Sequence, residues 1–159
     1  MNVLTAAAIA LAGLAFALPA ASHAESKAPN EAHSALNKSH RVVIQVTQND
    51  PAIMNMALNN AENMAKFYKD KGEKIEIEFV AYGAGLNMMR SDTSPVKERL
   101  TAISSSMKNV TFTGCGNTLA NQSKQENKAI TLVPEARVVP TGIARIVELE
   151  EQGWTYVRP

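Results

Sequence analysis

Cysteine and histidine are scarce in this 159-residue chain. Cys115 is the single cysteine, so no intramolecular disulfide framework can form. All three histidines precede residue 41, which leaves the region 41–159 without one. Catalytic pairs of the Ser–His or Cys–His type need an imidazole beside the nucleophile. The sequence therefore argues strongly against hydrolases of these two kinds.

Aromatic residues and unbalanced charge are also lacking. Aromatics make up 5% of the chain and the formal net charge is +1, with both signs interspersed. A nucleic-acid-binding protein usually carries a basic stripe, and single-strand binders add aromatic stacking platforms. Neither feature is present, so we expect no nucleic-acid partner.

The first 24 residues are typical of a signal peptide. The apolar run 6–18 is shorter than the roughly 20 residues a spanning helix needs, and Ser22-His23-Ala24 fits a small-x-small cleavage site. No Lys or Arg precedes the run, which departs from the usual pattern. We predict export to the periplasm, with no membrane association after cleavage at Ala24.

Residues 25–40 are polar and lack a sustained apolar period, which predicts a flexible linker. The linker contains His33 and His40. Two histidines seven apart can bind a metal weakly, but solvated tail residues are the favoured interpretation.

The rest of the chain, 41–159, is the size of one domain in which strands and helices alternate. Strands are expected at 41–47, 74–82, 110–113, 137–139 and 154–157. Helices are expected at 51–71, after Ser94-Pro95, after Cys115 and after Thr141. Between them we expect a tight loop at 83–85, a helical turn at 86–90 and a polar surface segment, or surface excursion, at 121–129. This order predicts an α/β fold: a three-layer α/β/α sandwich with a mostly parallel five-stranded sheet.

Cys115 is the sharpest chemical signal. It lies between two glycines at a strand-to-helix junction, where free amide groups and the helix dipole favour a thiolate. Ligands in such folds bind beyond the carboxyl ends of the strands. The expected crevice is lined by Asn49, Tyr82, Gly83, Gly85, Gly116 and Asn117. The alternative is a packed core cysteine, because free cysteine is often buried, and spacing alone does not decide between the two.

Other motifs are weaker. Gly83-Ala84-Gly85 lacks the lysine and third glycine of a phosphate loop, which favours a plain turn. The six methionines of the mature sequence could form a copper site, but their helical spacing favours packing in the core. They are Met54, Met56, Met64, Met88, Met89 and Met107. No metal or organic cofactor is implied. The loop from Leu86 to Arg90 is expected to be exposed and apolar.

Four segments resemble one known family: VVIQVTQNDPAIMNMALNNAENM, IEFVAYGAGLNMM, VTFTGCGNTL and ARVVPTGIARIVELEEQGWTYVRP. Together they are similar to the DsrE/DsrF-like sulfur-relay family, in its exported branch, over about residues 41–159. The resemblance implies a five-stranded α/β/α sandwich, homo-oligomers that are often trimers or hexamers, and a junction cysteine that carries persulfide sulfur. Cys115 matches that cysteine.

Two functions follow as hypotheses. In the first, Cys115 of a periplasmic protein accepts sulfane sulfur as a persulfide and passes it on, with donor and acceptor proteins as partners. In the second, the protein is a non-enzymatic module that binds a small ligand or a protein, and Cys115 is structural.

Overall fold

A computed structural model describes residues 38–159 of the chain. The expected signal peptide and all but the end of the expected linker lie outside the described residues.

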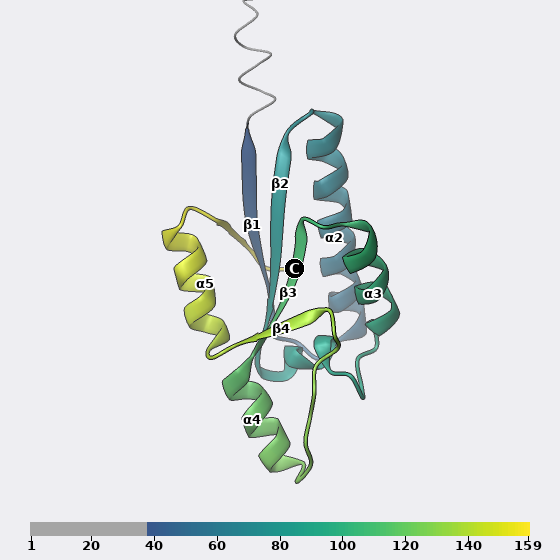
Figure 1. Ribbon diagram of the computed structural model, residues 1–159, viewed down its shortest axis with the longest axis vertical. Coiled ribbons are helices and arrows are strands. Elements are labelled where there is room, and N and C mark those ends of the chain that lie inside the picture. The colour runs from purple at the N-terminus through teal and green to yellow at the C-terminus, as the bar shows by residue number, and fades with distance from the viewer. Residues whose placement is uncertain (1–37) are drawn as a thin grey trace, which may run out of the picture.

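The described residues are built on one parallel sheet (Figure 1). Its strands are β1 (Ser39–Val46), β2 (Lys74–Ala81), β3 (Val110–Cys115), β4 (Ala136–Val139) and β5 (Thr155–Val157). All neighbouring strands pair in parallel, in the order β4-β3-β2-β1-β5. The predicted α/β fold with a five-stranded parallel sheet is thus confirmed.

The helical segments are α2 (Pro51–Asp70), η1 (Gly83–Met89), α3 (Lys97–Ser106), α4 (Gly116–Gln125) and α5 (Gly142–Glu151). The long helix α2 begins where expected, with Asp50 as its N-cap and Pro51 at the first position. An Asp50 side-chain oxygen accepts the Ala52 amide at 2.7 Å, which satisfies one of the amides left free at the start of the helix.

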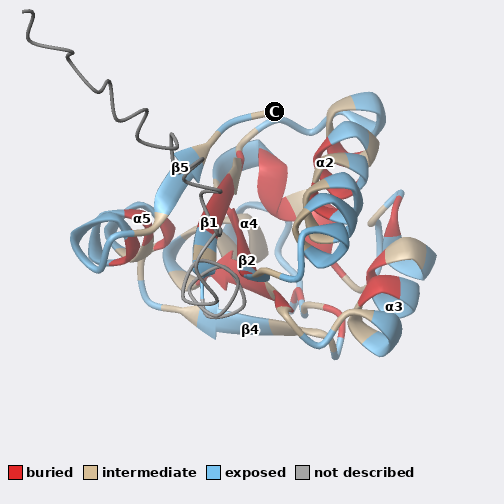
Figure 2. Cartoon of the chain, turned by 90° about the horizontal axis from the view of Figure 1, so that it is seen from above, coloured by how far each residue is buried: buried red, intermediate tan, exposed pale blue. Residues whose placement is uncertain are grey.

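The sheet is covered on both faces (Figure 2). Strands β1 to β4 step across the sheet in one direction, and right-handed crossovers put α2 and α3 on the same face. The main core lies there, with Phe79 stacked on Phe112 at a ring-centroid distance of 5.2 Å. Helix α5 returns over the opposite face, where Ile146 and Leu149 belong to a smaller buried cluster.

The expected bounds of β1 and of the segment after Cys115 were wrong. Strand β1 begins at Ser39, so His40 belongs to the sheet rather than to a linker. Its Nε2 lies 2.6 Å from a Glu73 carboxylate oxygen, and its ring stacks on Tyr68. These contacts come from residues more than 25 positions away, which no local pattern reveals. Helix α4 also continues to Gln125, into the segment expected to be a surface excursion.

The methionine-containing loop differs from expectation. Leu86, Met88 and Met89 are fully buried rather than exposed, because η1 folds back against β2 and β3. Core packing is confirmed for Met54, Met88 and Met89, but Met56 is 41% exposed on the outer side of α2. Helix α3 begins at Lys97, two residues after the expected start. The Ser94 hydroxyl donates to the Met88 carbonyl and accepts the Val96 amide at 3.3 Å, so Ser94 caps a turn before the helix, and Val96 is the N-cap of α3.

Candidate functional site

Cys115 lies at the carboxyl edge of the sheet, at the junction of β3 and α4 (Figure 1). It is the last residue of β3 and the N-cap of α4, and it is 5% exposed. The first residue of α5, Gly142, packs against it: a Cβ placed on Gly142 would lie 3.1 Å from the Cys115 Cβ. The starts of two helices therefore meet at the cysteine.

The surroundings of the sulfur favour its charged form. Burial raises the pKa of the Cys115 thiol, but the Thr118 hydroxyl and the amides of Gly142, Thr118 and Asn117 oppose it as hydrogen-bond donors, and the pKa falls below its ordinary value. The Cys115 side chain makes no N-cap hydrogen bond in the structure. The lowered pKa means that the polar groups around the sulfur favour the thiolate, which is the nucleophilic form.

Tyr82 follows β2 and packs beside the same glycine. Its Cβ and Cδ1 would each lie 3.2 Å from a Cβ on Gly142. The Tyr82 hydroxyl accepts a hydrogen bond from Gln45, and Gln45 in turn accepts one from the Tyr156 hydroxyl. Burial is the main cause that raises the pKa of Tyr82. Tyr82 is therefore a neutral neighbour of Cys115 at pH 7.

The peptide groups of Gly83 are held by α4. The Gly83 amide donates to the Thr118 hydroxyl oxygen at 3.1 Å, and its carbonyl accepts from the Gln122 side chain, also at 3.1 Å. Thr118 and Gln122 are four residues apart, so they lie on one face of the helix. Gly83 has a φ of 55°, which favours glycine. The turn after β2 is thereby fixed to the helix that begins at Cys115.

Asn117 joins the starts of the two helices. Its amide donates to the Pro140 carbonyl and its side chain donates to the Thr141 hydroxyl, both at 3.1 Å. The donors on α4 and α5 are in this way held in a fixed position relative to each other.

The structure gathers four of the predicted crevice residues near Cys115 and separates two. Tyr82, Gly83, Gly116 and Asn117 lie around it, as described above. Gly85 is instead buried under the end of β1, where a Cβ would lie 2.3 Å from the Val46 carbonyl oxygen. Asn49 accepts a hydrogen bond from Asn87 at 2.8 Å, on the side of η1.

The glycines that flank Cys115 are required by the packing around it. A Cβ on Gly114 would lie 2.5 Å from Leu132 and 3.1 Å from Leu86, and one on Gly116 would lie 3.1 Å from the Val139 carbonyl oxygen. The glycines therefore permit close packing around the junction, and they do not open the sulfur to solvent.

Thr118 and Gly142 are the functional candidates that sequence reasoning missed. Thr118 is the third residue after the N-cap, a position whose amide points toward the capping side chain, so helix-capping rules could have found it. Gly142 is 27 positions from Cys115 in the printed sequence. Only the pairing of β3 with β4 brings it to the site.

The buried carboxylate of Glu78 lies on the face of the sheet that α5 covers. It contacts Thr113, which is two residues before Cys115 on β3. Glu78 accepts two hydrogen bonds from Arg145, each at 2.9 Å, and one each from Arg137 and Thr113, both at 2.8 Å. Burial alone would raise the pKa of Glu78, but these donors lower it below its ordinary value. Because Arg145 is on the first turn of α5, the cluster fixes the helix whose first amide faces Cys115.

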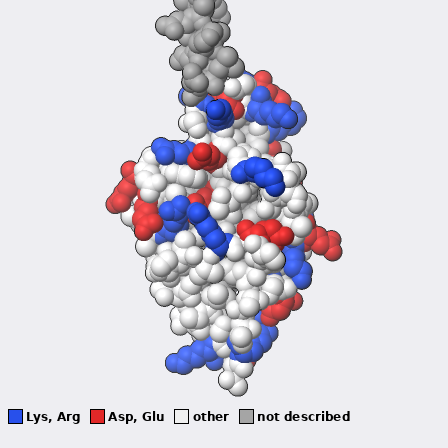
Figure 3. Space-filling view, in the orientation of Figure 1, with Lys and Arg blue, Asp and Glu red and all other residues white. Residues whose placement is uncertain are grey.

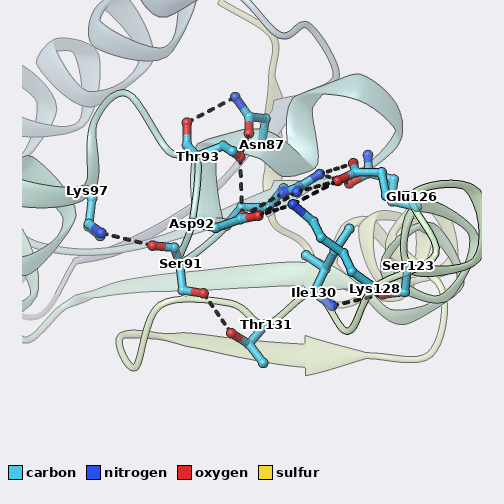
Figure 4. Close-up of polar contacts among 12 residues, drawn as sticks. Asn87, Ser91, Asp92, Thr93, Lys97, Ser123, Glu126, Lys128, Ile130 and Thr131 are labelled. Carbon is cyan, nitrogen blue, oxygen red and sulfur yellow. Dashed lines mark hydrogen bonds and ion pairs between the residues drawn. The ribbon is translucent and has the colours of Figure 1, made fainter.

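A second ion-pair cluster fixes the other end of α4 (Figure 4). The Arg90 guanidinium donates to Asp92 at 2.8 and 2.9 Å and to Glu126 at 2.5 and 2.9 Å, and Lys128 contacts both carboxylates. These contacts hold the pKa of Glu126 at about 2. Since both edges of the Arg90 guanidinium are taken up by carboxylates, it is not a free cation beside Cys115.

Other features lie away from the cysteine. A surface groove of about 680 Å³ lies at the opposite edge of the sheet, where it is lined by Ser39, Lys69, Lys74 and Asn109 among others. Within residues 38–159, no three His, Cys, Asp or Glu side chains gather in a way that could hold a metal ion. None of the helices in that range is both long and apolar enough to span a membrane.

Comparison with known proteins supports the fold. No family model and no curated protein matches this sequence. Among solved structures, MTH1491 from Methanobacterium thermoautotrophicum, a protein of unknown function, is 28% identical with a TM-score of 0.64. The match covers 76% of this chain and 99% of that one. This chain thus shares its α/β architecture with a protein of unknown function.

Proposed function

We propose that this protein handles sulfane sulfur, with Cys115 accepting it as a persulfide and passing it to a partner thiol. The observation that carries the proposal is the position of Cys115, which is the N-cap of α4 and packs against Gly142, the first residue of α5. At this position the Thr118 hydroxyl and the amides of Gly142 and Thr118 lower the pKa of the thiol. A thiolate is the form that attacks sulfur.

The transfer needs no change in overall oxidation state. The Cys115 thiolate attacks the outer sulfur of a donor persulfide, a new S–S bond forms, and the old S–S bond breaks. The donor leaves as a thiolate with the electron pair of that bond. An acceptor thiolate then attacks the outer sulfur of the Cys115 persulfide. The S–S bond to Cys115 breaks, and Cys115 is released as a thiolate again. The donor groups that stabilise the Cys115 thiolate act in both steps, because it is nucleophile first and leaving group second.

One observation favours the second candidate, a binding module with a structural cysteine. Cys115 is 5% exposed, and a sulfur acceptor must admit a donor sulfur to within bonding distance. The two candidates differ in whether the folded protein reacts.

Intact-mass measurement distinguishes them. Full-length protein incubated with inorganic polysulfide should gain about 32 Da for each added sulfur, and a thiol reductant should remove the addition. The Cys115→Ser protein is the control and should gain nothing. If the folded wild-type protein stays unmodified while urea-unfolded protein reacts, Cys115 is structural and the binding module is correct.

We also propose that the protein is exported and works in the periplasm. The support is the sequence of residues 1–24, which lie outside the described range. N-terminal sequencing of protein from the periplasmic fraction should give Glu25 as the first residue. Recovery of intact Met1 in a membrane fraction would contradict the proposal.

We propose further that the protein is a homo-oligomer, a trimer or hexamer as the family resemblance implies. Three apolar side chains near the site are unusually exposed: Val138, Ile143 and Val147, at 53%, 52% and 48%. Figure 3 shows few charged side chains over the first part of α4. Light scattering should give a multiple of the monomer mass, and Ile143→Asp should reduce it. Phe67→Asp, at an equally exposed position on α2, is the control.

A further inference from the structure

We infer that Arg137 is a specificity-determining residue, which makes the site at Cys115 favour small reactants that carry a negative charge. The inference rests on the proposed function for its substrate class, which is then a small anionic donor of sulfane sulfur. Its physical content is the attraction of an anion toward the cysteine. That attraction can be measured whether or not sulfur transfer occurs.

The first observation is that Arg137 and Cys115 lie on the same face of the sheet. Arg137 pairs with Thr113 in the register of β4 with β3, and its Nε donates to the Thr113 hydroxyl at 3.1 Å. Thr113 and Cys115 are two residues apart on β3, so their side chains leave the same face. The contact of Cys115 with Gly142 of α5 identifies it as the face that α5 covers. Two residues of strand span about 7 Å, which places the guanidinium about 7 to 10 Å from the sulfur.

The second observation is that the Arg137 guanidinium is fixed in place by part of its donor set. Besides the bond from Nε to Thr113, its Nη2 donates to a Glu78 carboxylate oxygen at 2.8 Å. Glu78 is buried, and it also accepts two hydrogen bonds from Arg145 and one from Thr113. A carboxylate has about four positions that accept hydrogen bonds. The acceptor that holds Arg137 is therefore fully occupied and cannot move toward solvent with it.

The third observation is that the rest of this guanidinium is free to bind a ligand. Its Nη1, and the second N–H of Nη2, have no acceptor within residues 38–159. The Arg137 side chain is 50% exposed and belongs to an edge strand of the sheet. A guanidinium presents its donors as a rigid fork that fits carboxylates and other anions. Arg137 thus offers an oriented, accessible donor pair on the cysteine side of the sheet.

The charges around Arg137 leave it a net cation. Arg137 and Arg145 share the single buried carboxylate of Glu78. The other acidic neighbour is Glu148, which lies 3.5 Å from Nη1 of Arg145 and whose side chain is 59% exposed. Water screens an exposed carboxylate of this kind, so it compensates little of the charge on Arg137. An anion that approaches Cys115 along this face is therefore attracted.

The experiment compares alkylation of Cys115 by iodoacetate and by iodoacetamide in the folded full-length protein, where it is the single cysteine. The two reagents have similar size and both react with the thiolate, so the ratio of their rates at one pH does not depend on the pKa of the thiol. Only iodoacetate is an anion. Arg137→Gln should lower the iodoacetate-to-iodoacetamide ratio by about two- to fivefold, the effect of one unit charge at this distance. Arg137→Lys keeps the charge and should retain most of the ratio. Arg99→Gln is the matched control, because it removes a cation that pairs with Glu62 on the α2 and α3 face, and it should leave the ratio unchanged.

Circular dichroism shows whether each variant is folded, and salt provides a test that needs no variant. Screening weakens the attraction of an anion to Arg137, so the ratio for wild-type protein should fall as NaCl rises from about 20 mM to about 0.5 M. A free thiolate repels iodoacetate, and its ratio should rise over the same range. An unchanged ratio in folded Arg137→Gln protein, a wild-type ratio that rises with salt, or no alkylation of folded protein by either reagent would overturn the inference. A ratio that behaves as expected, in a protein that forms no polysulfide adduct, would leave it standing and refute the sulfur-transfer function instead.

Discussion

Glu78 is the buried charge on which the α5 face of the sheet depends, and Glu78→Gln tests that dependence. The glutamine keeps the shape and the contact with Thr113 but removes the charge that pairs with Arg145 and Arg137. Breaking a fully buried ion pair costs about 3–5 kcal/mol. The Arg145 and Arg137 side chains are 22% and 50% exposed, so water can solvate them in the variant. We therefore expect a smaller loss of stability, about 2–3 kcal/mol.

Urea unfolding at fixed protein concentration measures this loss. With a typical urea dependence of about 2 kcal/mol/M, the midpoint should fall by about 1–1.5 M at pH 7. Glu151→Gln is a control at the exposed end of α5, and it should change the midpoint by less than about 0.3 M. A fall in the Glu78→Gln midpoint no larger than that of the control would refute the reasoning.

The pH dependence provides a second check on Glu78. Its pKa is lowered in the folded protein from an ordinary value of 4.5. The ionised carboxylate therefore contributes its full stability above about pH 4.5 and loses it as pH falls through the folded-state pKa. The difference in unfolding free energy between wild type and Glu78→Gln should be constant at neutral pH and shrink in acid. A difference that grows as pH falls would contradict the assignment.

Three further predictions follow from single contacts. Asp50→Ala removes the cap of α2 and should cost about 1 kcal/mol in urea unfolding; no change would contradict the capping role. Gly85→Ala should destabilise by about 3 kcal/mol or more in the same assay, because its Cβ would lie 2.3 Å from the Val46 carbonyl oxygen; a stable variant would show that the turn can relax. His40→Phe should raise the pKa of Glu73, now lowered chiefly by its hydrogen bond to His40, in a carboxyl-carbon NMR titration; an unchanged Glu73 pKa would refute this.

The position of Cys115 could be predicted from local sequence because a strand-to-helix junction has a local signature. The β-branched run before Cys115 and the glycines around it marked the end of a strand and the start of a helix. The predicted parallel sheet then placed Tyr82, Gly83, Gly116 and Asn117 at the same edge. Asn49 and Gly85 were also assigned to that edge, but the fold directs them toward η1 and β1.

Periodicity and turn chemistry by themselves determined the α/β class, the strand count and the start of α2 after its N-cap Asp50, because these depend on residues within a few positions of one another. Tertiary structure alone decided the burial of Met88 and Met89, the place of His40 in the sheet and the approach of Gly142 to Cys115. Each of these depends on segments far apart in the chain. The electrostatics of the sulfur belong to this second group, since its donors come from the starts of two helices that only the completed sheet brings together.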